Sequence, residues 1–274
     1  MLEGHSDNVK AISFHPKDSN VLVSCGYEGL WVWDVASRTT TVKLNATMRE
    51  FHSSDVLCFT WACDGTSLLT GSKDSDVKVW DVQNNYALLE TIVGHKASVL
   101  SIVVHPETKM IATAGRDSTI KIWDGKTLDV SFRAKRADDS GIKCALLHNL
   151  DGHRGDIVTL TWAAPFVLYS GARDNTIKVW DCRNGNAVRD FEDKANAFGK
   201  HRGDIRRMIC LPGGPHIVTC SLDSTMKLWK AAPTEAKEVI ELSDAKRDEA
   251  EAKLLASILS DGVAHEEAKA AVRS

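Results

Sequence analysis

The amino-acid sequence predicts an all-β fold built from five repeated units. Two observations carry this prediction. The dipeptide Trp-Asp recurs at a regular interval, and a histidine stands 27 or 28 residues before each recurring tryptophan. Between these landmarks, short runs rich in Val, Ile, Thr and Trp alternate with turn residues, a pattern typical of short strands rather than helices.

The landmark residues keep their spacing through all five units, which indicates a repeat architecture. An acid stands six residues before the tryptophan in units two to five. In the first unit the acid is Glu28, five residues before Trp33, which predicts a turn that is one residue shorter. The histidines are His5, His52, His95, His153 and His201; the later tryptophans are Trp80, Trp123, Trp180 and Trp229; the later acids are Asp74, Asp117, Asp174 and Asp223.

The third unit shows the expected strands most clearly. Strand-like runs cover residues 99–104, 110–114 and 119–123, with turn residues between them. A fourth run follows each tryptophan, as at residues 86–93 in the second unit. Four short antiparallel strands per unit form one blade of a β-propeller.

These residues carry a resemblance to the WD-repeat family of β-propellers, over residues 4 to about 242. The resemblance implies five four-stranded blades in residues 1–243, with residues 238–242 as the outer strand of the fifth. Rings of this family usually have seven blades. Three alternatives therefore remain: a fragment of a longer seven-bladed ring, a closed five-bladed ring, or an open array whose ends are covered by a partner. We expect a fragment or an open array.

The C-terminal segment, residues 244–274, changes character. It is rich in strong helix formers, and four apolar residues recur at helical spacing within it. We expect a helical tail that packs on the fifth blade, and an interaction or oligomerisation helix is the alternative. The apolar residues are Leu254, Leu255, Ile258 and Leu259.

The recurring polar residues suggest catalytic chemistry at first sight, but the same set recurs in every unit, whereas a catalyst needs one site. The resemblance implies instead a structural hydrogen-bonded chain of histidine, hydroxyl, aspartate and tryptophan. We expect the hydroxyl two residues before the acid, where only Ser72 and Ser221 supply it. The expected network is His52, Ser72, Asp74, Trp80, His95, Asp117, Trp123, His153, Asp174, Trp180, His201, Ser221, Asp223 and Trp229.

Basic residues recur beside these landmarks, at positions that the resemblance places on the face where propellers bind their partners. A convergent basic rim would hold an acidic or phosphorylated peptide through charge-assisted hydrogen bonds. Aspartates at positions 55, 156 and 204 stand close enough in the sequence to neutralise it. The rim residues are Lys73, Lys96, Arg116, Arg154, Arg173 and Arg202.

The fourth unit carries a further motif, Trp-Asp-Cys-Arg. It resembles the box by which some WD-repeat proteins dock onto the adaptor of a cullin–RING ubiquitin ligase. The matching positions are Asp174, Asp181 and Arg183. The other units lack the arginine.

Composition limits the remaining functions. The net charge of −3 supplies no global attraction to nucleic acid or an anionic membrane. The seven cysteines form no Cys-x-x-Cys pair, so neither a zinc site nor a redox motif is indicated. No apolar run is long enough to span a bilayer, and the N-terminal residues do not resemble a secretory signal. These features favour an intracellular protein, cytoplasmic or nuclear, without cofactor or metal.

We expect a non-enzymatic scaffold that binds other proteins in a multiprotein assembly. The alternatives are a substrate receptor of a cullin–RING ubiquitin ligase and an RNA-associated assembly factor that meets nucleic acid only indirectly. Self-association through open blade ends or the C-terminal helix is a further expectation.

Overall fold

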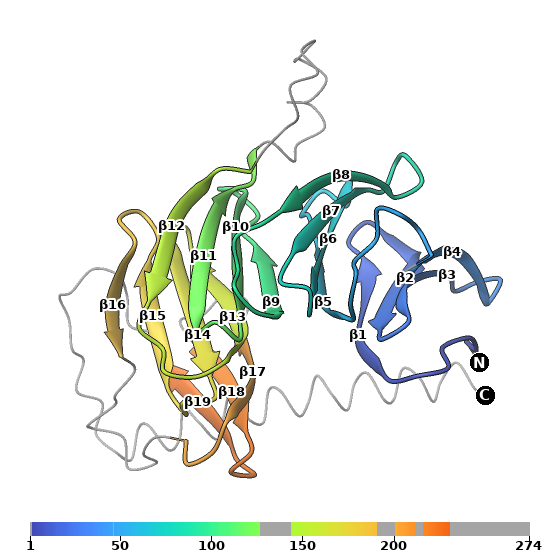
Figure 1. The fold of residues 1–274 in the computed structure, drawn as a ribbon. Coiled ribbons are helices and arrows are strands. Elements are labelled where there is room, and N and C mark those ends of the chain that lie inside the picture. The colour runs from blue at the N-terminus through green and yellow to red at the C-terminus, as the bar shows by residue number, and fades with distance from the viewer. Residues whose placement is uncertain (1, 46, 127–143, 191–200, 212–215, 231–274) are drawn as a thin grey trace. The chain divides into compact units, whose positions relative to one another are not determined.

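The computed structural model describes residues 2–45, 47–126, 144–190, 201–211 and 216–230. The chain divides into two compact units, Met1–Ala232 and Pro233–Ser274, and all described residues belong to the first. The described residues form nineteen β-strands in five antiparallel sheets and no α-helix (Figure 1). The all-β prediction is confirmed. The expected strand at residues 238–242 and the expected tail helix lie outside the described residues.

The first two sheets each have four strands that pair in chain order, as expected for propeller blades. The first blade contains β1 (Val9–His15), β2 (Asp18–Gly26), β3 (Gly29–Asp34) and β4 (Thr39–Leu44). The second blade contains β5 (Val56–Trp61), β6 (Ser67–Ser72), β7 (Val77–Asp81) and β8 (Ala87–Ile92).

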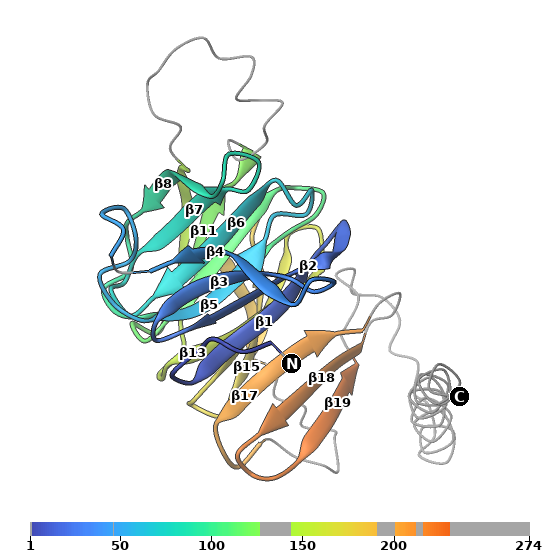
Figure 2. The same ribbon diagram turned by 90° about the vertical axis from the view of Figure 1, so that its right-hand side faces the viewer.

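The next two sheets repeat this arrangement, and three strands of the fifth are described (Figure 2). The third blade contains β9 (Val99–Val104), β10 (Met110–Gly115), β11 (Thr119–Asp124) and β12 (Leu146–Asp151). The fourth contains β13 (Ile157–Ala164), β14 (Val167–Ala172), β15 (Ile177–Asp181) and β16 (Asn186–Asp190). The fifth contains β17 (Ile205–Cys210), β18 (His216–Ser221) and β19 (Met226–Lys230).

The turn between the second and third strands explains the spacing difference in the first unit. In blades two to five this turn includes a residue in the left-handed region, such as Ser118 with φ of 59°. In the first blade only Tyr27 and Glu28 separate Gly26 from Gly29, and these two glycines pair across the hairpin. Gly29 adopts a φ of 129°, which favours glycine. The shorter turn predicted from the sequence is thus confirmed.

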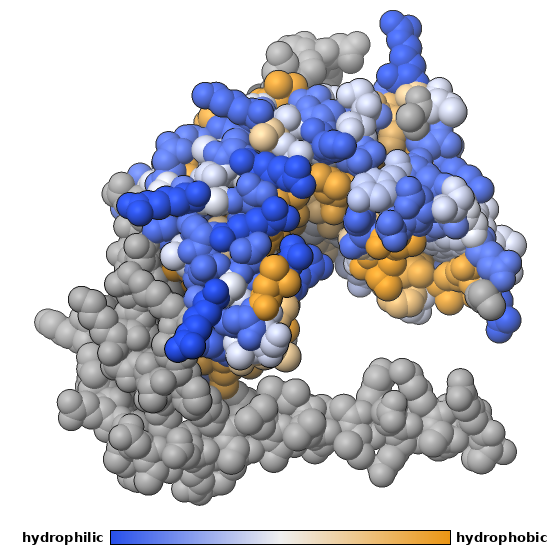
Figure 3. Space-filling view, turned by 60° about the horizontal axis from the view of Figure 1, so that its bottom comes forward, coloured by the Kyte–Doolittle hydropathy of each residue, from blue (hydrophilic) through white to orange (hydrophobic). Residues whose placement is uncertain are grey.

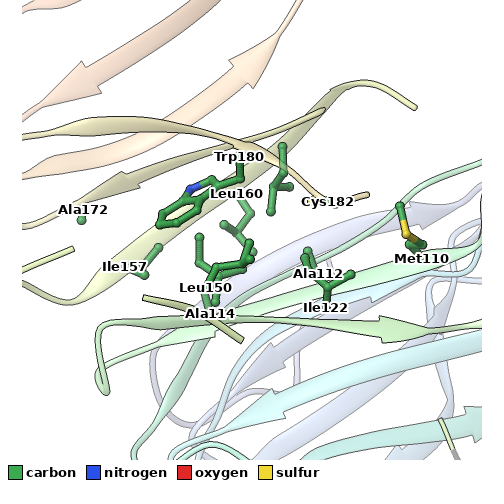
Figure 4. Close-up of a cluster of buried hydrophobic side chains, with 12 residues drawn as sticks. Met110, Ala112, Ala114, Ile122, Leu150, Ile157, Leu160, Ala172, Trp180 and Cys182 are labelled. Atoms are coloured by element: carbon green, nitrogen blue, oxygen red, sulfur yellow. The ribbon is translucent and has the colours of Figure 1, made fainter. Parts of the chain in front are cut away.

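The hydrophobic core is divided among four clusters, and each cluster joins two consecutive blades. The junction between the third and fourth blades contains Ala114, Ile157, Leu160 and Trp180 (Figure 4). Burying one large apolar side chain contributes about 1.5–3 kcal/mol. Each blade is therefore stabilised by its neighbours as well as by its own strands.

The innermost strands continue the same packing. β1 packs on β5, β5 on β9, β9 on β13 and β13 on β17. β1 and β17 form no comparable pair among the described strands. The two ends of the blade series therefore present faces that blades two to four bury.

Seven free cysteines are spread over all five blades. Burial raises the pKa of the Cys25 and Cys182 thiols to about 12, so both are protonated at neutral pH. The described part of the chain contains no helix long and apolar enough to cross a membrane. The cysteines are Cys25, Cys58, Cys63, Cys144, Cys182, Cys210 and Cys220.

Candidate functional site

The recurring histidine, aspartate and tryptophan form a hydrogen-bonded chain in blades two to five. In the third blade, Trp123 Nε1–H donates to Thr113 Oγ1 at 2.9 Å, and His95 Nε2 lies 2.8 Å from the same oxygen. His95 Nδ1 lies 2.8 Å from Asp117 Oδ2, which also accepts the backbone N–H of Lys96 at 3.0 Å. The chain thereby connects the second strand, the third strand and the segment before the first strand.

The same bonds recur in the second, fourth and fifth blades. The histidine-to-aspartate distances are 3.0 Å for His52 and Asp74, 2.9 Å for His153 and Asp174, and 2.8 Å for His201 and Asp223. The hydroxyls between histidine and tryptophan belong to Thr70, Ser170 and Thr219.

The structure corrects the expected position of this hydroxyl. It lies four residues before the acid, inside the second strand and within reach of the tryptophan on the third. The expected residues, Ser72 and Ser221, lie at the ends of β6 and β18. Their hydroxyls bond to a backbone N–H group of the turn that follows each strand. Ser72 Oγ donates to the carbonyl of Ser54 at 3.2 Å and accepts the N–H of Asp74 at 3.1 Å. The chain is consequently complete in four blades, not only in the second and fifth.

The first blade has an incomplete version of the chain. Ser24 Oγ lies 2.7 Å from both His5 Nε2 and Trp33 Nε1. The shorter turn holds Glu28 Oε2 3.5 Å from His5 Nδ1, and this buried nitrogen has no hydrogen-bond partner among the described residues. The His5 ring stacks instead on Trp31, with 4.4 Å between ring centroids.

The aspartates of these chains are ionised at neutral pH. Burial alone would raise the pKa of Asp74, but hydrogen bonds and the charge of His52, with backbone N–H donors, lower it to about 2. The pKa values of Asp117, Asp174 and Asp223 are lowered in the same way, by hydrogen bonds that outweigh burial. Burial lowers the pKa of His95, so its ring is neutral.

This arrangement has the properties of a scaffold rather than of a reaction centre. In blades two to five the histidine rings are buried, and both ring nitrogens are bonded within the blade. No ring nitrogen of these four histidines is therefore available to a substrate. The described residues also contain no group of three or more side chains that could hold a metal ion.

Three of the expected rim residues are paired with aspartates. Arg116 of the third blade reaches Asp156 of the fourth, with 3.7 Å between Nε and Oδ2. Arg173 of the fourth blade contacts Asp156 at 3.0 Å and Asp204 of the fifth at 3.8 Å. Lys73 lies 3.7 Å from Asp55 within the second blade. The pairs of Arg116 and Arg173 cross blade junctions, and the aspartates balance their charge.

The other three rim residues have charged side chains that are exposed to solvent. Lys96, Arg154 and Arg202 directly follow the blade histidines, and their side chains are exposed. Their backbone N–H groups donate to the network aspartates, which anchors each main chain. None of the three side chains forms an ion pair with another described residue.

The motif of the fourth blade forms a local ion pair. Arg183 donates to Asp181 through Nε at 3.0 Å and through Nη2 at 2.7 Å. The Arg183 side chain is largely exposed. Asp174 belongs to the buried chain of the blade, since it contacts His153.

The profile "WD domain, G-beta repeat" matches this sequence in five stretches, residues 1–34, 43–81, 86–124, 144–181 and 194–230. Together they cover well over half of the chain, and each contains one complete set of landmarks. The chain belongs to the WD40 family. WD40 proteins generally act as scaffolds for protein interactions.

Curated relatives of this WD40 chain are distant and diverse. It is 25% identical, over 84% of its length, to a guanine nucleotide-binding protein subunit beta from Arabidopsis thaliana, 58% of which is covered. It is 24% identical over 82% of its length to WD repeat-containing protein 1 from Xenopus tropicalis, 34% of which is covered. It is 27% identical over 85% of its length to protein transport protein SEC31 from Chaetomium globosum, 17% of which is covered. The chain thus spans between about a sixth and three fifths of these relatives.

Proposed function

We propose that this WD40 chain is a non-enzymatic scaffold, cytoplasmic or nuclear, that binds other proteins through loops at one end of its blades. The observation that carries the proposal is that the polar residues fall into two groups, one bonded within the blades and one exposed on the loops. The histidines and aspartates are used within the blades, whereas the basic residues beside them point to solvent. Binding capacity therefore lies on the loops, and the blades position them.

The binding surface that the geometry favours consists of Lys96, Arg154 and Arg202, called here the free basic trio. Among the described residues, no aspartate pairs with these side chains, in contrast to Lys73, Arg116 and Arg173. Their anchored main chains reduce the entropy lost on binding. Three cations on consecutive blades suit a partner with an acidic or phosphorylated segment.

Affinity capture with the full chain, followed by mass spectrometry, tests this proposal. The variant Lys96→Glu, Arg154→Glu, Arg202→Glu should lose the partner, and capture by the wild-type chain should weaken as salt rises. A matched control, Lys17→Glu, Arg38→Glu, Lys126→Glu, makes the same charge change on exposed residues of other loops. Partners retained equally by all three proteins would contradict the free basic trio as the binding surface.

A second function is favoured by the exposed Asp181–Arg183 pair, which matches the ligase-adaptor motif. As a substrate receptor, the chain would recover the cullin adaptor in the same capture, and Arg183→Ala would abolish that recovery. Lys126→Ala is the control, because Lys126 is exposed and holds the equivalent position in the third blade. Absence of the adaptor from wild-type captures would exclude this function.

A further inference from the structure

The exposed apolar residues of the described chain gather at the two ends of the blade series. Twelve large hydrophobic residues are exposed, and six of them lie on β1 or in the fifth blade. Figure 3 shows apolar side chains on one face of the part that carries the first blade. We call Val9, Ile12 and Phe14 the leading face, and Ile209, Leu222 and Met226 the trailing face.

The leading face exposes positions that other blades bury. Val9 stands four residues after the blade histidine and is 47% exposed, whereas its equivalents in the other four blades are completely buried. Ile12 is 68% exposed, although its equivalents Ile102, Leu160 and Met208 are at most 4% exposed. In blades two to five these positions lie in the clusters shared with the preceding blade. The equivalents of Val9 are Val56, Val99, Ile157 and Ile205.

The trailing face shows the same contrast on the other side of a blade. Met226 is 73% exposed, but the residues at its position in the four other blades are at most 3% exposed. Ile209 is equivalent to Val103, whose carbonyl accepts Trp162 Nε1–H of the following blade at 3.4 Å. The position of Trp162 is held in the first blade by Phe14. The equivalents of Met226 are Leu30, Val77, Ile120 and Ile177.

The internal junctions show that the two faces are complementary. At each junction, the first strand of one blade packs against a residue of the preceding blade. This residue stands three positions before the recurring acid of that preceding blade. A methyl group added to Gly71 would lie 2.8 Å from Val99 Cγ1, which shows how close this approach is. Cys25 holds the same position in the first blade and is buried in one cluster with Val56. Cys220 holds the corresponding position in the fifth blade. Since Cys25 packs with Val56 inside the chain, Cys220 can pack in the same way with Val9 of the leading face.

The electrostatics of the two faces also agree. The third and fourth junctions place arginine opposite aspartate, as in Arg116 with Asp156 and Arg173 with Asp204. At the ends, the corresponding positions hold Leu222 and Asn8, both uncharged. Bringing the faces together would therefore leave no lone charge at this contact, the usual obstacle to an apolar interface.

We propose that the trailing face of one copy of this chain packs on the leading face of a second copy. The occupant is a second copy because every copy carries both halves of a junction that already occurs four times within the chain. The interface is head-to-tail, so one free face of each kind remains after every addition. This association does not depend on the proposed scaffold function.

Sedimentation velocity on the full chain tests this proposal, from roughly 1 to 100 µM, where an interface of modest affinity populates both free and bound states. The wild-type chain should form oligomers whose size grows with concentration. Ile12→Glu blocks only the leading face and Met226→Glu blocks only the trailing face. Each variant alone should remain a monomer, because one of the two faces that form the interface is blocked in every copy. Both residues are mostly exposed, so neither substitution should disturb the fold.

The decisive sample is an equimolar mixture of the two variants. The intact trailing face of Ile12→Glu should bind the intact leading face of Met226→Glu, giving a 1:1 dimer and nothing larger. Val93→Glu, at an exposed residue outside both faces, should behave as the wild type. A wild-type chain that stays monomeric, single variants that still self-associate, or a mixture that stays monomeric would each overturn the proposal.

Discussion

The aspartate of each hydrogen-bonded chain determines which nitrogen of the histidine ring carries the proton. An ionised carboxylate only accepts hydrogen bonds, so the His95 nitrogen facing Asp117 must be Nδ1–H. Nε2 then accepts the Thr113 hydroxyl proton, and Thr113 Oγ1 accepts Trp123 Nε1–H. Every donor in this buried chain has one acceptor, so removing one member leaves its neighbours unsatisfied.

We expect Thr113→Val to lower the free energy of unfolding by about 1–3 kcal/mol, because it leaves Trp123 Nε1 and His95 Nε2 without their partner. Thr113→Ser is the matched control, since it keeps the hydroxyl, and the fourth blade uses serine at this position. Urea unfolding of both variants measures the difference. Equal losses in the two variants would contradict the role of the hydroxyl, because serine keeps this group and valine lacks it.

The lowered aspartate pKa values predict how stability depends on pH. The pKa of Asp74 is about 2 in the folded chain, below its usual value, so its contribution to stability is complete above about pH 4 and is lost as pH falls toward 2. Asp74→Asn should therefore be less stable than the wild type at pH 6, and the gap should shrink between pH 4 and 2. Thermal unfolding across this range measures it, and a constant gap would contradict the assignment.

His95 adds an effect at higher pH. Its pKa is lowered by burial, so the folded state favours the neutral ring while the unfolded chain gains a proton. This contribution is complete above about pH 6.5 and decreases as the pH falls below that value. His95→Gln should remove this part of the slope between pH 6.5 and 5.

The residues of the network were predictable from the sequence, but the linking hydroxyl was misplaced. Ser72 and Thr70 are two residues apart on one strand, and both have hydroxyls, so residue type could not separate them. The two positions can be distinguished by how often a hydroxyl recurs at each of them in the five units. A serine or threonine stands four residues before the acid in every unit, whereas the position two residues before it holds a hydroxyl in only two. No single-unit pattern reveals the pairing of Arg116 with Asp156, because it depends on how consecutive blades pack.

The sequence patterns predicted the single strands and turns most accurately. The predicted strands of the third unit agree with β9, β10 and β11 to within one residue at each end. Strand alternation and turn chemistry are local, so one unit is sufficient to reveal them. The close approach between blades is not local, and Gly71 gave no signal of its contact with Val99.

Gly71→Ala should therefore lower stability by about 1–3 kcal/mol, since the added methyl group would lie 2.8 Å from both Cys58 Sγ and Val99 Cγ1. Adding Val99→Ala opens space, so the double variant should lose less than the sum of the single losses. A double-mutant cycle by urea unfolding measures this coupling. Strict additivity would show that the blades move apart instead.

The whole described unit is a linear series in which each blade depends on its immediate neighbours. The second strands of blades two to four are completely buried, whereas β18 of the fifth blade is only partly buried and β1 is largely exposed. The sequence predicted five blades and raised the question of their ends. It could not show which side chains the ends expose, because burial depends on how neighbouring blades pack.

This gradient predicts the order of local opening. In dilute solution, amide hydrogens of β6, β10 and β14 should exchange at least about tenfold more slowly than those of β1 and β18, since end blades have one neighbour and opening them costs less. Hydrogen exchange followed by mass spectrometry measures this by peptide. Uniform protection across all five blades would indicate a single cooperative unit instead.

The distribution of free cysteines gives the chain a native set of chemical reporters. Each blade contains at least one thiol, and none is joined in a disulfide. A buried thiol such as Cys25 or Cys182 reacts with an alkylating reagent only after its surroundings open, because burial both shields it and keeps it protonated. Timed alkylation, read by peptide mass, would therefore record the sequence in which blades unfold without any introduced label.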